Sequence, residues 1–256
     1  NYRDFEKLRS IYNSLDGMFK KGTFYSKRIL ANYYNNRAMI HSKFNELKEA
    51  EKYGYLSIRQ KNGDYLFYLI NLCGVLLRQN KAPEALEIMA EAIPEMKKTT
   101  SFYNKIGFVS FYVKTLNLNK KAAVAESYAG SFLEAYRREI FNHRWHLFFC
   151  AYLQSLLLEE KYGKLMSIVK RYNLIRREKK QVGRARYLPT ILWYFLLAEY
   201  KEGLTDEEEL KSAVIRSGNE LIKHRYKRIK IRELFEELSV HLPGTFKTIR
   251  RELQLE

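Results

Sequence analysis

The chain has 256 residues, 46% of them hydrophobic and 14% aromatic, so it has enough apolar material for a folded core and an intrinsically disordered chain is excluded. The formal net charge of +17 favours attraction to acidic partners but is compatible with any fold. No apolar run approaches the roughly 18 residues that a membrane-spanning helix needs. Cys73 and Cys150 both lie in apolar runs, which is typical of buried thiols in a reducing compartment, so we expect a cytoplasmic protein.

Apolar residues recur at intervals of three and four along most of the chain, and this spacing predicts an all-α protein. The first predicted helix, Tyr2–Leu15, is ended by Asp16 and Gly17. It precedes the first helical pair on its own, so it is either the second helix of an earlier, incomplete unit or a cap. The helices predicted after it are Phe24–Phe44, Leu47–Gln60, Tyr65–Gln79, Pro83–Met96, Phe102–Leu116, Lys120–Arg137, Ile140–Leu158, Tyr162–Ile175 and Tyr187–Tyr200.

A helix start is predicted near Thr205, which forms a Thr-x-x-Glu capping box with Glu208. The acidic residues of this segment would also lie at the positive end of the helix. We expect this helix to run to about His224. Two shorter helices are predicted to follow, near Ile229–Val240 and Phe246–Leu253.

Two stretches of the chain repeat one pattern at an offset of about 35 residues. When residues 31–65 are aligned with 66–100, small residues coincide at three places, with large apolar residues between them. The coinciding pairs are Ala38 with Cys73, Ala50 with Ala85, and Ser57 with Ala92. A third stretch, about 37 residues further on, supplies Ser110, Ala122 and Ala129. Recurrence at this length, with small residues where two helices must touch, is typical of stacked helical hairpins.

The pattern resembles that of the tetratricopeptide repeat family, whose unit has small residues at its eighth, twentieth and twenty-seventh positions and bulky apolar ones at its fourth and eleventh. The bulky positions here are Tyr34, His41, Leu69, Leu76, Ile106 and Val113. Asn36 and Asn71 match the asparagine often found sixth. The chain departs from the family where the usual tryptophan at the fourth position is missing, and where Gly54 and Glu126 replace the usual aromatic residue at the twenty-fourth.

The resemblance implies a right-handed α-solenoid, in which helical hairpins stack into one superhelical domain over residues 1–256. Its expected parts are a partial unit or N-terminal cap (1–22), three recognisable repeats (23–138), degenerate repeats (139–204) and C-terminal capping helices (205–256).

In this family, ligands usually lie in the concave groove lined by the first helix of each hairpin, so the resemblance also implies a partner-binding groove. The positions transferred to this chain are Asn32, Asn35, Met39, Lys43, Phe67, Ile70, Arg78, Asn104, Phe111 and Lys114. Amides, aromatic rings and cations together suit an extended peptide. The alternative is that the apolar members are ordinary packing residues. The family's clamp for a partner's C-terminal carboxylate is matched only at Asn71, so that route is not expected.

Basic residues concentrate in the C-terminal third, and the ones singled out are Arg176, Arg177, Lys179, Lys180, Arg184, Arg186, Arg225, Lys227, Arg228 and Lys230. Together with tyrosines such as Tyr172 they could hold a nucleic-acid backbone. The alternative is a solvated basic face. The sequence favours this alternative, because no recognised nucleic-acid-binding motif accompanies the charge.

His143, His146 and Cys150 are spaced so that they fall along one side of a helix, as metal ligands could. The same run contains several large apolar residues, and a packed helix explains it without a metal. We predict no metal site and no cofactor. The chain also has no glycine-rich phosphate loop, nucleophile elbow or histidine-glutamate zinc motif, so neither an enzyme nor a small-molecule substrate is expected.

The sequence therefore predicts a non-enzymatic scaffold or adaptor that binds a peptide or helix of another protein in the groove of a helical-repeat domain. The alternative prediction is a nucleic-acid-associated helical-repeat protein that uses the basic C-terminal third.

Overall fold

The computed structural model describes residues 2–20, 26–61, 64–180, 190–223 and 239–254. In these residues the chain forms fourteen helices and no strand, so the predicted all-α class is confirmed. The chain divides into two compact units, residues 1–148 and 149–256, and the boundary lies inside helix α9 (Trp145–Leu158). The helices of the first unit are α1 (Tyr2–Lys20), α2 (Lys27–Lys43), α3 (Leu47–Ile58), α4 (Tyr65–Arg78), α5 (Ala82–Glu91), α6 (Ile93–Lys98), α7 (Phe102–Leu118) and α8 (Ala122–Ile140).

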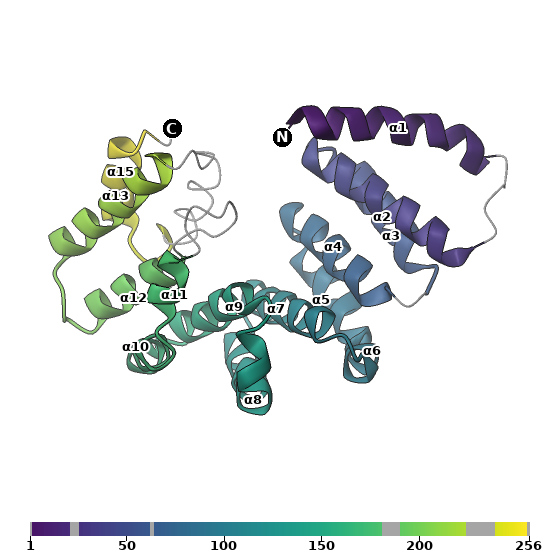
Figure 1. Cartoon of the computed structure of the whole chain (residues 1–256). Coiled ribbons are helices and arrows are strands. Elements are labelled where there is room, and N and C mark those ends of the chain that lie inside the picture. The colour runs from purple at the N-terminus through teal and green to yellow at the C-terminus, as the bar shows by residue number, and fades with distance from the viewer. Residues whose placement is uncertain (1, 21–25, 62–63, 181–189, 224–238, 255–256) are drawn as a thin grey trace. The chain divides into compact units, whose positions relative to one another are not determined.

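The second unit is shorter, and its described residues also form helices joined by turns (Figure 1). After α9 (Trp145–Leu158) come α10 (Tyr162–Arg171), α11 (Leu174–Lys179), α12 (Thr190–Lys201), α13 (Glu207–Lys223) and α15 (Pro243–Glu252). Helix α12 packs against α10, α11 and α13, and α13 also packs against α15. The core of this unit includes Trp193, whose side chain is fully buried and whose indole N–H donates to the hydroxyl of Ser217 at 3.0 Å.

Helical hairpins form the first unit (Figure 1). Helix α2 packs against α3, α4 against α5, and α7 against α8. The first helix of each later pair also contacts both helices of the pair before it, because α4 packs against α2 and α3, and α7 packs against α4 and α5. Each hairpin therefore buries its neighbour's apolar face as well as its own.

The turn inside each hairpin has the same backbone conformation. One residue just past the first helix adopts positive φ, and the next residue donates its backbone N–H to a carbonyl in the last turn of that helix, as in a Schellman motif. In the three hairpins of the first unit this residue is Asn45, Asn80 or Lys120, and Glu160 after α9 and Gly203 after α12 have the same conformation. Asparagine and glycine are the residues that tolerate this conformation best. The sequence did carry this signal at Asn45 and Asn80, which lie 35 residues apart.

The small residues of the repeat pattern are all buried. Ala38, Cys73 and Ser110 in the first helices are at most 3% exposed. The small residues in or just after the second helices, Ala50, Ala85, Ala122, Ser57, Ala92 and Ala129, are at most 7% exposed. Small side chains at these places let neighbouring helices approach closely.

The third hairpin shifts the repeat register in its second helix. Ala50 and Ala85 are each the fourth residue of their helix, whereas Ala122 is the first residue of α8. The fourth residue of α8 is Ala125, which is fully buried. Helix α7 is three residues longer than α4, so the turn at Lys120 lies 40 residues after the turn at Asn80. Ala125 thus occupies the place that the sequence pattern assigned to Ala122.

Several predicted helix boundaries are wrong. Asp16 and Gly17 do not end α1, because the helix continues past them to Lys20. The predicted helix Ile140–Leu158 starts too early, because Ile140 is the last residue of α8 and a turn over residues 141–144 precedes α9. At the start of α13 the cap is Asp206, whose carboxylate accepts the backbone N–H of Glu209 at 2.8 Å. The hydroxyl of Thr205 instead donates to the Glu209 side chain. Most of the predicted helix near Ile229–Val240 lies outside the described residues.

Two helix glycines differ in the space around them, and this difference predicts opposite effects of alanine. A Cβ at Gly54 would lie 2.8 Å from Cδ1 of Leu72, a side chain that is 1% exposed, whereas a Cβ at Gly74 would meet nothing closer than 3.6 Å. We expect Gly54→Ala to lower the free energy of unfolding by about 1 kcal/mol, because overpacking outweighs the gain in helix propensity. Gly74→Ala is expected to raise it by about 0.5–1 kcal/mol. Urea unfolding of both variants checks this, and a stabilised Gly54→Ala would contradict the close contact with Leu72.

Candidate functional site

The first helices α2, α4 and α7 lie side by side and carry the ten residues predicted to line a groove (Figure 1). Their exposure falls into three groups. Exposed side chains are Asn32, Lys43 and Arg78; half-buried ones are Met39, Phe67, Asn104, Phe111 and Lys114; buried ones are Asn35 and Ile70. The half-buried group has one apolar member on α2, one on α4 and three members on α7, of which two are polar, so this surface offers both apolar contact area and hydrogen-bonding groups.

Polar side chains on this surface join α2 to α4. The hydroxyl of Tyr68 donates to Oδ1 of Asn32 at 2.7 Å. The amide of Asn71 donates to Oδ1 of Asn35 at 2.9 Å. Both pairs are 36 residues apart, close to one repeat. Asn32 and Asn35 therefore already contribute to the contact between neighbouring hairpins, a role that the sequence alone did not predict.

Arg78 also holds two hairpins together. Its guanidinium donates to the backbone carbonyl of Ser42 at 2.8 Å, to the Ser42 hydroxyl at 2.7 Å, and to Oδ1 of Asn45 at 3.0 Å. A cation at this place also complements the negative end of the α2 dipole. Arg78 is thus a structural residue at the end of α2, and its replacement would change folding as well as binding.

Two aromatic residues lie on the α4–α7 part of the surface. The ring of Phe111 faces Gly74, whose missing side chain leaves room for it, with 3.6 Å from the ring to an ideal Cβ position. Phe67 is seven residues, or two helical turns, before Gly74, so it lies on the same side of α4. Lys114 on α7 is half-buried. Phe67, Phe111 and Lys114 form what we call the α4–α7 surface.

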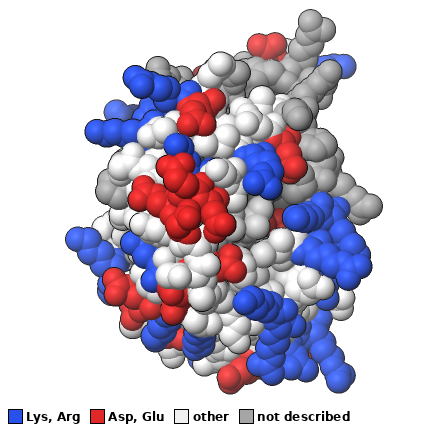
Figure 2. All heavy atoms as spheres, turned by 90° about the vertical axis from the view of Figure 1, so that its left-hand side faces the viewer, with Lys and Arg blue, Asp and Glu red and all other residues white. Residues whose placement is uncertain are grey.

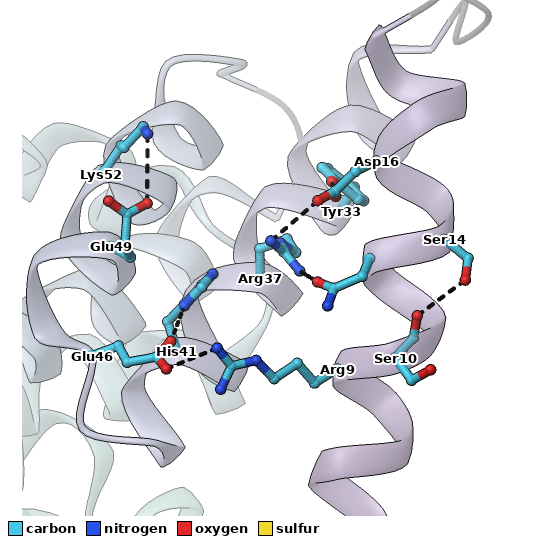
Figure 3. Close-up of polar contacts among 11 residues, drawn as sticks. Arg9, Ser10, Ser14, Asp16, Tyr33, Arg37, His41, Glu46, Glu49 and Lys52 are labelled. Carbon is cyan, nitrogen blue, oxygen red and sulfur yellow. Dashed lines mark hydrogen bonds and ion pairs between the residues drawn. The ribbon is translucent and has the colours of Figure 1, made fainter.

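A second group of polar residues joins α1 to α2 (Figure 3). The Arg37 side chain is 7% exposed and lies 3.3 Å from a carboxylate oxygen of Asp16, and it donates to Oδ1 of Asn13 at 2.8 Å. The hydroxyl of Tyr33 donates to the other oxygen of Asp16. Burial, and then the nearby Asp16 carboxylate, raise the pKa of Tyr33, so the phenol stays a donor. We call these four residues the α1–α2 clasp.

A third polar group connects α1 to the turn between α2 and α3 (Figure 3). Glu46 accepts from Arg9 at 2.9 Å and shares a 2.5 Å hydrogen bond with Nδ1 of His41. The hydrogen bond with His41, and then the bonds from Arg9, hold the pKa of the Glu46 carboxyl below its ordinary value. The buried His41 ring stacks on Tyr53 with a centroid separation of 5.3 Å, and its Nε2 has no partner among the described residues.

The lowered pKa of Glu46 predicts a pH-dependent contribution to stability. A carboxylate whose pKa is lower in the folded protein stabilises it above the unfolded pKa, and this stabilisation is lost as the pH falls through the folded value. We expect Glu46→Gln to reduce stability at pH 7 and to approach the wild type below about pH 4. Thermal melts from pH 7 to 3 check this. Glu49→Gln, at an exposed carboxylate, is the control, and an equal effect there would contradict a special role for Glu46.

A hollow of about 630 Å³ lies beside this group and is lined by Glu6, Arg9, Ser10, Asn13, Ser14 and Phe44. Its polar groups are largely engaged already. Arg9 binds Glu46 and lies 4.8 Å over the Phe44 ring, Asn13 accepts from Arg37, and the Ser14 hydroxyl donates to the Ser10 carbonyl. The hollow therefore offers few unengaged polar groups to a ligand. No pattern in the sequence points to it.

Of the predicted basic patch, Arg176, Arg177, Lys179 and Lys180 are exposed on and next to α11. The other six, Arg184, Arg186, Arg225, Lys227, Arg228 and Lys230, lie outside the described residues. Figure 2 shows one side of the molecule, where acidic side chains gather into a patch with groups of basic side chains around it. Four of the ten predicted members are therefore described by the structure, and all four are exposed.

His143, His146 and Cys150 are not brought together as a cluster that could bind a metal. Among the described residues, no three His, Cys, Asp or Glu side chains form a group that could hold a metal ion. The ring of His143 is exposed and lies 5.3 Å from that of Phe102, whereas His146 is buried against Trp145. Burial raises the pKa of the Cys73 thiol to about 11, so this thiol is a packing residue.

The fold and these surfaces define an all-helical protein whose polar groups connect helices to one another. In the described residues, no helix is both long and apolar enough to cross a membrane. Comparison with models of known families, with curated proteins and with solved structures gave no match. The function is therefore argued from the surfaces themselves.

Proposed function

We propose that this protein is a non-enzymatic interaction scaffold. In this proposal the hairpins form a right-handed, tetratricopeptide-like α-solenoid, and the face of α2, α4 and α7 binds an extended peptide or a helix of a partner protein. The observation that carries the proposal is that the first helices of successive hairpins lie side by side, with α4 contacting α2 and α7 contacting α4. Such an arrangement makes one continuous surface from a repeated unit.

Two further observations support the repeat architecture. The small residues that recur in the sequence are buried in all three hairpins, and the turn of each hairpin has one residue at positive φ. Both features follow from hairpins of one shape packed in series. The repeat pattern is shifted by three residues in α8, where Ala125 occupies the position predicted for Ala122.

The composition of the surface supports a peptide as the ligand. Phe67 and Phe111 offer apolar area, Asn104 offers an amide and Lys114 a cation, and none of these side chains is fully buried. Half-exposed aromatic residues beside polar groups are typical of sites that bind peptides. The engaged side chains Asn32, Asn35 and Arg78 fasten α2 to α4, which would keep this surface rigid.

The test is selection of binding peptides from a displayed library of random 12-residue sequences, with the full chain as bait. Enriched peptides are then titrated against the double variant Phe67→Ser/Lys114→Glu, which alters the α4–α7 surface without touching Arg78. We expect affinity to fall about tenfold or more, because half-buried aromatic anchors carry much of such binding energy.

The matched control is Val124→Ser/Lys121→Glu, which makes the same kinds of change at exposed positions of α8 and its start. Circular dichroism and thermal melts confirm that both variants fold. If enriched peptides bind wild type and the Phe67 variant equally, or if the α8 control weakens binding as much, the proposed surface is wrong.

A further inference from the structure

The second unit carries a compact group of cations that the proposed function does not use. Between residues 170 and 180 there are six lysine or arginine residues and one acid. All six cations are exposed. They are Lys170 and Arg171 at the end of α10 and Arg176, Arg177, Lys179 and Lys180 on and next to α11, and together we call them the basic face.

The one acid of this segment points away from the basic face. Glu178 is 1% exposed, and its carboxylate accepts the backbone N–H groups of Ile191 at 3.1 Å and Leu192 at 3.0 Å. These N–H groups belong to the first turn of α12, so Glu178 caps that helix from a neighbouring one and complements its dipole. Its carboxylate is therefore engaged inside the unit.

Most cations of the basic face have no acidic partner. Lys170, Arg171, Arg176, Lys179 and Lys180 make no ion pair with any acid in the part of the chain that the structure describes. Lys170 and Arg171 instead have their charged ends 5.6 Å and 5.9 Å from the centres of the Phe195 and Tyr172 rings. Lys170 therefore lies beside α12 and Arg171 beside its neighbour Tyr172, while both side chains stay exposed.

The apolar residues of the same segment are turned inward. Leu174 is fully buried, and α10 buries Leu165, Met166, Ile168 and Val169. No large apolar side chain between residues 170 and 180 is exposed. A membrane-surface helix needs exposed apolar residues to enter the lipid, and an amphipathic peptide ligand needs an apolar surface to cover. Because Leu174 is buried and Tyr172 and Ile175 are half-buried, the basic face offers little apolar area to either of them.

We propose that the basic face binds the phosphate backbone of a nucleic acid. Three of its six cations are arginines, whose planar guanidinium groups donate two parallel hydrogen bonds to a phosphate. Helix α11 rises about 9 Å over its six residues, a length over which a duplex presents several phosphates. Tyr172 lies half-buried within the segment and supplies an aromatic ring beside the backbone site. Binding through phosphates is independent of base sequence and depends on salt.

The test measures fluorescence anisotropy of a labelled 20-base-pair duplex and a labelled 20-nucleotide RNA strand, each titrated with the full chain. With about six phosphate contacts, duplex affinity should fall about a thousandfold between 50 and 200 mM salt. The variant Arg176→Gln/Lys179→Gln/Lys180→Gln removes three contacts. It should bind more weakly at 50 mM salt, and the slope of log affinity against log salt should decrease by about three.

The matched control, Lys48→Gln/Lys97→Gln/Lys121→Gln, removes the same charge from exposed positions of the first unit. It should keep the wild-type slope. Thermal melts establish that both variants fold. No binding at 50 mM salt, an equal loss in the control, or tight binding to vesicles of anionic lipid with the same variant dependence would each overturn the proposal. These outcomes do not involve the α4–α7 surface, so they leave the proposed scaffold function unaffected.

Discussion

Replacing Asp16 with alanine is expected to lower the free energy of unfolding by about 2–3 kcal/mol. Asp16 is the anion of the α1–α2 clasp, and without it the Arg37 guanidinium, 7% exposed, keeps only Asn13 and the ring of Tyr53 as partners. A buried charge that loses its counter-ion typically costs 3–5 kcal/mol, and the value is reduced here because Asp16 itself is 30% exposed. Urea unfolding followed by circular dichroism measures the loss.

The double variant Asp16→Ala/Arg37→Met separates this cause from a general loss of packing. Methionine fills much of the volume of the arginine stem and carries no charge, and Nε of Arg37 already lacks a partner among the described residues. Removal of both charges should therefore cost less than removal of Asp16 alone. A double variant at least as unstable as Asp16→Ala would mean that the clasp contributes through shape and not through charge.

Replacing Ala85 with leucine is expected to lower the free energy of unfolding by about 3 kcal/mol, the upper part of the usual range for overpacked cores. Ala85 is fully buried in α5, which packs against both α4 and α7. Three added carbon atoms have to push one of these helices away. Because α5 joins two hairpins, the displacement should weaken their contact as well as the α4–α5 pair.

Ala90→Leu is the control for this second prediction, because Ala90 is an exposed residue of the same helix. Its effect is expected within about 0.5 kcal/mol, as for most surface substitutions. Chemical unfolding of both variants gives the comparison. If Ala85→Leu is as stable as Ala90→Leu, the small residues are not where helices approach closely, and the proposed repeat architecture loses its packing basis.

Helix α4 illustrates how much of the fold could be predicted. It was placed at Tyr65–Gln79 from apolar spacing, and it runs from Tyr65 to Arg78. The polar residues between it and α2 were assigned correctly to helices, but their pairing was not foreseen. Asn35 was predicted to meet a ligand, and its amide oxygen instead accepts from Asn71. Spacing along one helix specifies which side a residue is on, whereas its partner depends on the neighbouring helix.

In the candidate sites, too, the sequence indicated which residues matter but not which partners they contact. Cations at 176–180 were picked out from the sequence, but the inward position of Glu178, and with it the uncompensated charge of the basic face, depends on where α12 begins. Asp16 was interpreted as the end of a helix. It lies within α1 and binds Arg37, which is 21 residues further along the chain. No local pattern links two residues at that separation.

The sequence was sufficient for the helical class, for the approximate position of most helices, and for the burial of the recurring small residues. Each of these depends on hydrogen bonds and side-chain spacing within a few residues, so a local pattern carries the information. The α1–α2 clasp, the Arg78 contacts at the end of α2, the register of α8 and the capping of α12 by Glu178 came from the way the helices pack. Those contacts join residues that are distant in the chain, and their geometry is set by all the helices that surround them.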